Sequence, residues 1–399
     1  PPLEVLHVGK YFPPFSGGME TYLRDLMVEH TRQGIRCTAL VHASGFSLSS
    51  QQQQYEANGV KLGITRVAVW AKLLFTPISP TFPLWLHKLI RREKPDVIHL
   101  HMPNVSVFWL LLLPGARRIP WVIHWHSDVL ASTHSRGLRL FYSFYRPLER
   151  AMLQRCQVII ASSPPYLESS QPLAPFREKC TVVPLGLDPS NLAHEEVSVT
   201  RSAAERLRVL AIGRLTYYKG FAYLVRAAAE TPDIDIRIVG DGDLAAALPD
   251  LARELGVEQQ LSFLGHLPDR DLAREYVTCD CFCLPSIERT EAFGLVLLEA
   301  MYSGKATVVG DVPGSGMGWI VDDGVTGLKV PVANARALAA AFRQLSTDRD
   351  NLARLGRGGR HKFDRLFHIQ KSASEVARLY AGLAGIKQQD PGGASCQSE

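Results

Sequence analysis

The chain has 399 residues, longer than one ordinary hydrophobic core supports, which predicts two domains with a cleft between them. Hydrophobic residues make up 46% and charged residues 21%, a composition that excludes a disordered or fibrous chain. The net charge of +5 and the pI near 8.8 suit attraction to phosphates or to an anionic bilayer surface, and they argue against nucleic acid as a partner.

Two short apolar segments, residues 3–9 and 207–213, predict strands that end in glycine. A glycine-bearing loop follows each strand, and then a helix over residues 19–33 or a helix that ends near residue 230. Strand, loop and helix in this order form the βαβ unit, whose right-handed crossover gives parallel sheets covered on both faces. Further buried strands are predicted at residues 97–101, 122–124, 158–161, 236–239, 261–264, 281–284 and 306–309. We therefore expect an α/β fold of two Rossmann-like, doubly wound domains that face a central cleft.

The polar segment 188–205 separates the two halves, which predicts an N-terminal domain over residues 1–195 and a C-terminal domain over 205–365. A helix at about 366–385 is expected to pack back on the N-terminal domain. The glutamine run 51–54 predicts a mobile loop. Residues 387–399 are rich in Gln, Gly, Ser and Pro, which predicts a disordered tail.

Three polar side chains, Glu4, His7 and Lys10, interrupt the first apolar stretch, so no secretory signal is expected there. The longest apolar runs, such as residues 105–114, span about ten residues, short of the roughly 20 that cross a bilayer. We expect a cytoplasmic protein that does not span a membrane.

The seven cysteines lack the spacing of a disulfide scaffold, which favours a reducing compartment. Cys279, Cys281 and Cys283 alternate within a predicted strand, and alternation places all three on one face. Because a structural zinc site usually has a turn between paired cysteines, we interpret them as core thiols.

Ligands of open α/β sheets bind beyond the carboxyl ends of the strands, so the loops that follow strands carry the chemistry. Arg214 and Lys219 follow the first strand of the C-terminal half and flank a turn. A guanidinium and an ammonium in this position suit a diphosphate. A solvated surface pair is the alternative.

The segment from Glu291 to Glu299 leads from the predicted strand 281–284 into a helix that begins at about residue 293 or 294. Amides at a helix N-terminus favour phosphate. Glu299 lies in an apolar stretch, where a carboxylate is costly unless a ribose hydroxyl, a cation or a structural hydrogen bond receives it. Glu291, at the mouth of the loop, is placed to approach a sugar.

Glu291 and Glu299 match the E-x7-E motif of the retaining family 4 glycosyltransferases, which have the GT-B fold. The order of the surrounding motifs also resembles that family over essentially the whole chain, most securely over residues 208–331. These motifs are Gly213-Arg214, Lys219-Gly220, Gly240-Asp241-Gly242, Phe263-Leu264-Gly265 and Pro285-Ser286.

The resemblance implies roles for the matching residues on the donor side. Arg214 and Lys219 would neutralise the donor diphosphate, Glu299 would hold the ribose, and Glu291 would contact the transferred sugar. Backbone groups would complete the donor site; those on the C-terminal side are at Gly265, Phe293, Gly294 and Leu295.

Gly17 and Gly18 match the glycine loop of the family, in which the absence of side chains lets the backbone approach the donor phosphate. A flexible turn is the alternative for this pair. The string from His124 to Asp128 resembles the family segment that holds a histidine near the transferred sugar, and we assign that role to His126. Asp128 would orient His126 or the acceptor, although both histidines could simply end a strand.

The resemblance also implies a mechanism and substrates. Retention is ascribed to front-face attack without a metal or another cofactor, in which charge on the leaving diphosphate is stabilised electrostatically. Trp125-His-Ser-Asp128 and residues 217–220 and 289–294 resemble bacterial polysaccharide mannosyltransferases. These strings favour GDP-mannose as donor and a lipid-linked or oligosaccharide acceptor; UDP-glucose and UDP-N-acetylglucosamine are the alternative donors.

Residues 70–75 and 82–92 mix aromatic, aliphatic and cationic side chains, as do helices that lie on the cytoplasmic face of the inner membrane. An ordinary helix that covers the sheet explains the same pattern. Two other functions stay open. An NAD-dependent dehydrogenase would share the fold, but this sequence lacks a clean G-x-G-x-x-G motif. An inactive nucleotide-binding module would also keep the fold, but it would not need the charged residues Arg214, Lys219, Glu291 and Glu299.

Overall fold

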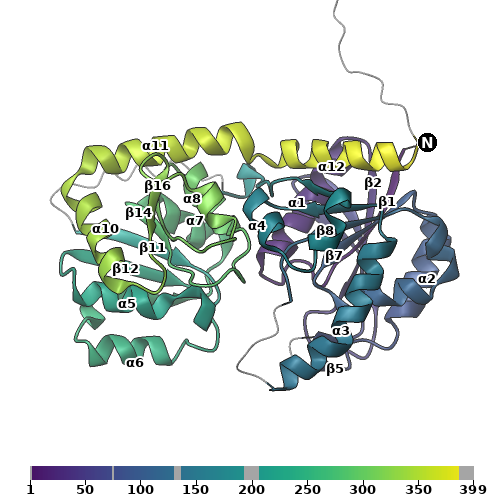
Figure 1. Cartoon of the computed structure of the whole chain (residues 1–399), viewed down its shortest axis with the longest axis horizontal. Helices are drawn as coiled ribbons and strands as arrows, with labels where there is room; N and C mark the ends of the chain where they lie inside the picture. Colours follow the sequence, from purple (N-terminus) through teal and green to yellow (C-terminus); the bar gives the residue numbers. More distant parts are fainter. Residues whose placement is uncertain (1, 74–75, 130–135, 193–205, 386–399) are drawn as a thin grey trace, which may run out of the picture.

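The computed structural model describes residues 2–73, 76–129, 136–192 and 206–385, and these residues form two lobes, each built on a sheet (Figure 1). The predicted disordered tail and most of the predicted boundary segment lie outside the described residues. In the N-terminal sheet the neighbouring strands are, in order, β10 (Cys180–Val182), β9 (Val158–Ala161), β8 (Trp121–Trp125), β7 (Val97–Met102), β1 (Glu4–Val8), β2 (Arg36–His42), β4 (Val60–Val67) and β3 (Gln51–Ala57). Its helices are α1 (Gly18–Arg32), α2 (Phe82–Glu93), α3 (Arg136–Arg155) and α4 (Pro164–Ser169).

The C-terminal sheet is parallel throughout. Its neighbouring strands are, in order, β13 (Leu261–Gly265), β12 (Ile234–Val239), β11 (Leu207–Ile212), β14 (Cys281–Leu284), β15 (Ala306–Gly310) and β16 (Gly327–Val330). Its helices are α5 (Phe221–Ala229), α6 (Ala247–Glu254), α7 (Asp269–Thr278), α8 (Leu295–Tyr302), α9 (Met317–Ile320), α10 (Ala335–Thr347) and α11 (Arg349–Leu366). The predicted α/β architecture with parallel sheets is confirmed.

The prediction of a loop at residues 51–54 is wrong, because this segment begins β3. β3 pairs antiparallel with β4 through the two-residue turn Asn58-Gly59, in which both residues have positive φ, 49° and 74°. Such a turn matches the twist of two antiparallel strands and forms a hairpin. β5 (Ala71–Leu73) and β6 (Thr76–Ile78) pair antiparallel in a separate two-stranded sheet.

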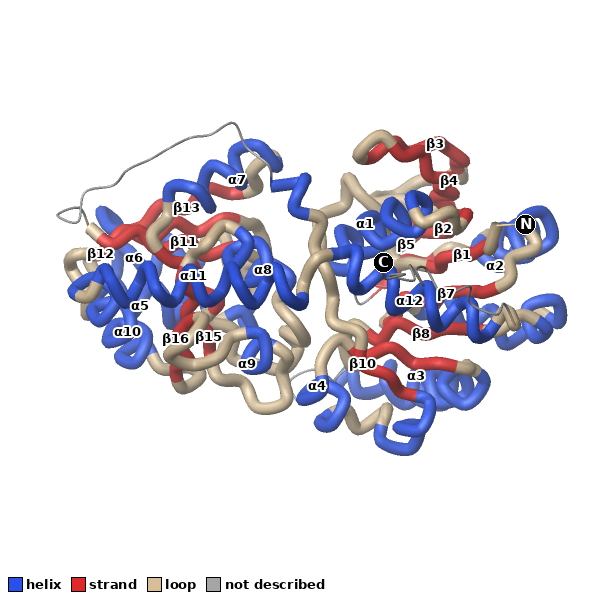
Figure 2. The backbone as a smooth tube through the Cα atoms, turned by 90° about the horizontal axis from the view of Figure 1, so that it is seen from above, coloured by secondary structure: helices blue, strands red, loops and turns tan. Residues whose placement is uncertain are grey.

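The chain crosses between the lobes at two places that lie side by side. Leu187 donates its N–H to the carbonyl of Phe367 at 2.9 Å, and Ile369 returns a bond to Leu187 at 3.0 Å. α12 (Ile369–Leu383) then runs over the N-terminal lobe (Figures 1 and 2). The Tyr22 hydroxyl of α1 hydrogen-bonds Ser372 of α12 at 2.7 Å.

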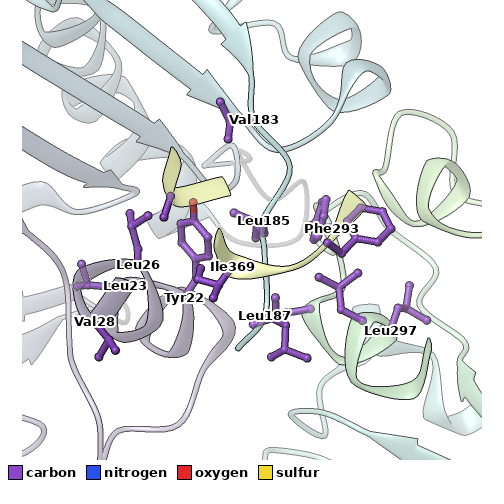
Figure 3. Packing of buried hydrophobic residues seen from close by; sticks show 14 of the residues in the cluster. Tyr22, Leu23, Leu26, Val28, Val183, Leu185, Leu187, Phe293, Leu297 and Ile369 are labelled. Carbon is purple, nitrogen blue, oxygen red and sulfur yellow. The ribbon is translucent and has the colours of Figure 1, made fainter. Parts of the chain in front are cut away.

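Apolar side chains fill the region where the lobes meet (Figure 3). Tyr22 and Leu26 come from α1, and Phe293 and Leu297 come from the C-terminal lobe. Leu185 comes from the loop that leads from β10 toward the C-terminal lobe. Their common burial fixes α1 against the start of α8, which positions the candidate site.

The cysteine prediction was right about burial and wrong about the common face. Cys281 and Cys283 pack in the C-terminal core on one side of β14. Cys279 follows α7 and packs in the cluster between the lobes, because the strand begins only at Cys281. Among the described helices, none is both long and apolar enough to cross a bilayer.

Candidate active site

Two helix N-termini face each other where the lobes meet. α1 begins after Gly17, and α8 begins after Gly294, whose φ of 85° is the left-handed conformation that glycine adopts readily. A Cβ built on Gly18 would lie 3.7 Å from the Cβ of Leu295, so the two helix starts are in near contact. Both carry the partial positive charge of a helix N-terminus, which makes this region suited to an anion.

The N–H groups of Phe293, Gly294 and Leu295 have no hydrogen-bond acceptor among the described residues. The Phe293 side chain is buried and contacts the Phe367 ring edge to face, so only its backbone is available to a ligand. The predicted role of these three residues as amide donors is therefore compatible with their surroundings.

Lys219 and Glu291 form an ion pair at the carboxyl edge of the C-terminal sheet. They come together because they follow the adjacent strands β11 and β14, and Ile287 donates a 2.8 Å hydrogen bond to the carbonyl of Tyr218. Gly220 has φ 71°, and a Cβ there would collide with the carbonyl of Pro285. Lys219 is only 9% exposed, so a ligand that takes its charge must replace or share the contact with Glu291.

Arg214 is exposed and lies beside the N-terminal lobe, where its charge affects the pKa values of Lys10 and Glu20. Burial raises the pKa of Glu20, and a Cβ on Gly17 would collide with its carboxylate. The N-terminus of α1 is thus already covered by a carboxylate from its own first turn, a partner that the sequence analysis missed.

Glu299 accepts a 2.6 Å hydrogen bond from the Tyr276 hydroxyl to its Oε2. Burial raises the pKa of Glu299 to about 7, and the neighbouring Asp25 and Asp269 act in the same direction. Among the described residues, none hydrogen-bonds Oε1 of Glu299. The structural hydrogen bond therefore leaves one carboxylate oxygen for a ligand.

Gly265 ends β13 with φ 63° and accepts a 2.8 Å hydrogen bond from the N–H of Gly240. A Cβ on Gly240 would collide with the carbonyl of Gly213, which follows β11. These close approaches hold the loops after three neighbouring strands at the same edge of the sheet as Lys219.

Asp128 does not hydrogen-bond His126. Its Oδ2 pairs with Arg289 of the C-terminal lobe at 2.6 Å, and its Oδ1 accepts bonds from Trp125 Nε1 at 2.8 Å and Ser170 Oγ at 2.7 Å. The carboxylate of Asp128 therefore links the two lobes, and it does not orient His126 by direct contact.

His126 follows β8 and is buried in a group of histidines. Its Nε2 lies 3.0 Å from Nδ1 of His101, and its ring stacks on His124 at 4.5 Å. Burial lowers the pKa of His126 to about 3, so the imidazole is neutral at physiological pH. Within the described residues, three groups have ligand atoms close enough for a shared metal ion: His7, His99 and His101; His7, His30 and Cys37; and His101, His124 and His126.

Comparison with known proteins identifies the family. A model described as Glycosyltransferase Family 4 matches residues 16–191, and one described as Glycosyl transferases group 1 matches residues 194–362. O-antigen chain mannosyltransferase C of Escherichia coli is 30% identical over 392 residues, which are 96% of this chain and 100% of the relative. This chain is a family 4 glycosyltransferase. The D-rhamnosyltransferase WbpZ of Pseudomonas aeruginosa is 31% identical over 302 residues, 74% of this chain and 77% of the relative.

Solved structures show that the glycosyltransferase shares its fold with distant proteins. Sucrose-phosphate synthase from Thermosynechococcus elongatus aligns with a TM-score of 0.76 at 21% identity, covering 96% of this chain and 99% of the other. Anabaena Alr3699/HepE in complex with UDP-glucose aligns with a TM-score of 0.74 at 19% identity, covering 95% and 100%. The GT-B fold and the hexosyltransferase class are confirmed, and the dehydrogenase alternative is removed.

The glycosyltransferase also has an apolar groove of about 360 Å³ that the sequence analysis missed. It lies between the 3-10 helix η1 (Val105–Leu112) and α3, and its lining is Val105, Phe108, Trp109, Leu111, Leu112, Phe144, Tyr145 and Leu148. Leu112 and Phe144 are 68% and 71% exposed. The nearby charge of Asp128 contributes to the raised pKa of Tyr145, so one wall of the groove lies close to Asp128.

Proposed function

We propose that this glycosyltransferase transfers mannose from GDP-mannose, with retention, to a lipid-linked or oligosaccharide acceptor in the synthesis of a bacterial cell-surface polysaccharide. The observation that carries the proposal is the convergence of the α1 and α8 N-termini beside the Lys219–Glu291 pair. The Escherichia coli relative is an O-antigen chain mannosyltransferase and the Pseudomonas aeruginosa relative is a D-rhamnosyltransferase, which supports transfer of a hexose or deoxyhexose in polysaccharide synthesis.

The donor diphosphate would lie between the two helix starts, where Lys219 and Arg214 supply the cations. Phosphate oxygens would accept bonds from the N–H groups of residues 293–295. Binding at the glycine pair 17–18 would require the Glu20 carboxylate, which lies against Gly17, to move off the α1 N-terminus. Lys219 would then leave Glu291 for the diphosphate, which frees the Glu291 carboxylate for a sugar hydroxyl. Glu299 would accept a ribose hydroxyl through Oε1, and the backbone around Gly265 would contact the base.

The reaction needs charge stabilisation on the leaving diphosphate, a term that commonly dominates catalysis. Lys219, Arg214 and the α8 N-terminus provide it without a metal ion. In front-face attack the bond between the anomeric carbon and the phosphate oxygen breaks, the new glycosidic bond forms on the same side of the sugar, and the leaving phosphate accepts the proton of the acceptor hydroxyl. His126, neutral because of burial, would hydrogen-bond a sugar hydroxyl and not act as a charged acid.

The donor is tested by release of the nucleotide from GDP-mannose, UDP-glucose and UDP-N-acetylglucosamine, each with lipid-linked and free oligosaccharide acceptors. Acceptor-dependent release from GDP-mannose alone supports the proposal, and the anomeric configuration of the product, read by NMR, tests retention. Preference for either UDP-sugar would contradict GDP-mannose as the donor and assign that UDP-sugar in its place. Absence of transfer from all three would favour the inactive-module alternative.

The lipid-linked acceptor and a position on the cytoplasmic face of the inner membrane are supported by the apolar groove and the charges around it. Segments 82–92, 105–118 and 142–150 carry several exposed cations, and their one acid, Glu149, is buried. An apolar concavity within a cationic surface suits an anionic bilayer and the hydrocarbon chain of a lipid acceptor. α2 itself buries Phe82, Leu86 and Leu89 against the sheet, so it also serves as an ordinary covering helix.

Sedimentation with vesicles tests membrane binding. Vesicles containing anionic lipid should retain the protein at low salt, and Leu112→Glu should release it, whereas Leu255→Glu on the C-terminal lobe should not. Equal binding of wild type and Leu112→Glu, or binding to neutral vesicles alone, would contradict the role of the groove.

A further inference from the structure

Five histidines lie on one face of the N-terminal sheet. His7 on β1 is opposite His99 on β7, and His101 on β7 is opposite His124 on β8. His126 is two residues beyond His124, and alternate residues of a strand share a face. All five are buried at the side of the sheet that contacts α1 and α12.

Two hydrogen bonds join three of these imidazoles into a chain. Nε2 of His126 lies 3.0 Å from Nδ1 of His101, and Nε2 of His101 lies 3.2 Å from Nδ1 of His7. At the ends of the chain, Nδ1 of His126 and Nε2 of His7 have no hydrogen-bond partner among the described residues. His124 stacks on His126 but neither of its nitrogens is paired there.

While the imidazoles of His126, His101 and His7 are neutral and keep both hydrogen bonds, their protons can be arranged in only two ways. Each neutral imidazole has one N–H, so a ring that donates through one nitrogen must accept through the other. In the inward arrangement His126 donates to His101, His101 donates to His7, and Nε2–H of His7 has no acceptor. In the outward arrangement His7 donates to His101, His101 donates to His126, and the free Nδ1 of His126 carries its proton.

We infer that His101 is a positioning residue that holds His126 in the outward arrangement, so that Nδ1–H of His126 is the donor offered to the sugar hydroxyl. In the inward arrangement the N–H without an acceptor is at Nε2 of His7, which is fully buried, and such an N–H is costly and rare. The outward arrangement ends the chain at His7 with a lone pair and places the free N–H at Nδ1 of His126, where the proposed sugar hydroxyl would accept it. The inference rests on the proposed role of His126. It gives that role a direction: His126 donates and does not accept.

The tautomer can be measured without any substrate. Long-range ¹H–¹⁵N correlation spectra of the full chain labelled with ¹⁵N-histidine distinguish a protonated Nδ1 from a protonated Nε2. In the wild type, His126 should be protonated at Nδ1. In His101→Phe, which removes both hydrogen bonds, that preference should be lost. His101→Asn should restore it, because the asparagine NH2 can donate to Nε2 of His126 while its carbonyl accepts the Nδ1–H of His7.

Transfer kinetics give the second measurement. His101→Phe should lower kcat about tenfold, the factor expected when one hydrogen bond worth about 1.4 kcal/mol is lost from the transition state, while the Kd for GDP is unchanged. His101→Asn should recover most of kcat. His124→Phe is the matched control, since it changes a buried histidine that stacks on His126 without a hydrogen bond, and its kcat should stay close to that of the wild type.

The outcomes separate this inference from the proposed function. A His126 protonated at Nε2 in the wild type, or an equal loss of kcat in His124→Phe and His101→Phe, would overturn the inference even if transfer depends on His126. A stoichiometric transition metal in the purified protein that is lost in His101→Phe would also overturn it, because a metal-bound His101 cannot relay a proton arrangement. Unchanged transfer in His126→Ala would instead refute the role of His126 itself.

Discussion

Protonation of Glu299 should compete with nucleotide binding. Burial raises the pKa of this carboxyl from 4.5 to about 7, so it carries a proton over much of the range in which an exposed glutamate is ionised. If the ribose hydroxyls donate to the carboxylate, binding must first remove that proton. For a pKa of about 7, the affinity for the nucleotide should fall about tenfold between pH 8 and pH 6, or about 1.4 kcal/mol.

Titration calorimetry of GDP binding at several pH values measures this effect, and Glu299→Gln is the control. Glutamine resembles the protonated carboxyl, so the variant should bind weakly and should lack the part of the pH dependence that comes from Glu299. Ionisation of the GDP phosphate affects both proteins equally, so its contribution to the pH dependence cancels when the two affinities are compared. Equal pH slopes in both would refute the ribose role.

The unliganded protein checks the raised pKa independently. Because the folded state holds a proton that the unfolded state releases, the contribution of Glu299 to stability is full below pH 4.5 and is lost as the pH rises through about 7. The unfolding free energy of the wild type relative to Glu299→Gln should therefore fall over this window. A constant difference in urea unfolding would contradict the shift.

Three further changes test the site. Arg289→Leu leaves the buried Asp128 carboxylate without its cation and should lower the free energy of unfolding in urea by about 2 kcal/mol. Adding Asp128→Asn should recover part of the loss, and no recovery would mean that the two residues are not coupled. Gly220→Ala places a methyl group against the carbonyl of Pro285 and should lower the Tm far more than Gly256→Ala, where φ is similar at 67° but the space is open. Equal losses of Tm would mean that the close approach at Gly220 is unimportant. His126→Ala should retain the GDP affinity of the wild type and lose transfer, and a proportional loss of both would place His126 in donor binding instead.

Much of the architecture could be predicted because its strands are short, buried, apolar runs followed by glycine loops. The strands at residues 158–161 and 281–284 have the predicted limits. β3 was missed because its first four residues are glutamines, without an apolar alternation. Its pairing with β4 follows from the Asn58-Gly59 turn, which was the available signal.

In the candidate site, contacts within one lobe follow more directly from the sequence than contacts between the lobes, although the sequence analysis named neither. Lys219 and Glu291 follow adjacent parallel strands, so their meeting follows from the strand order. The ion pair between Arg289 and Asp128 depends on how the lobes face each other, and the hydrophobic periodicity of the sequence does not predict that orientation. Glu20 could have been recognised as an acid in the first turn of a helix.

Thermal stabilisation by GDP, UDP and ADP at matched concentrations tests whether the donor binds where the two helix N-termini meet. A ligand that binds only the folded state raises the Tm once its concentration exceeds the Kd. We predict selective stabilisation by GDP that is lost in Lys219→Met. Stabilisation by UDP alone would contradict the assignment of the donor, and the absence of stabilisation by any of the three would contradict the donor site itself.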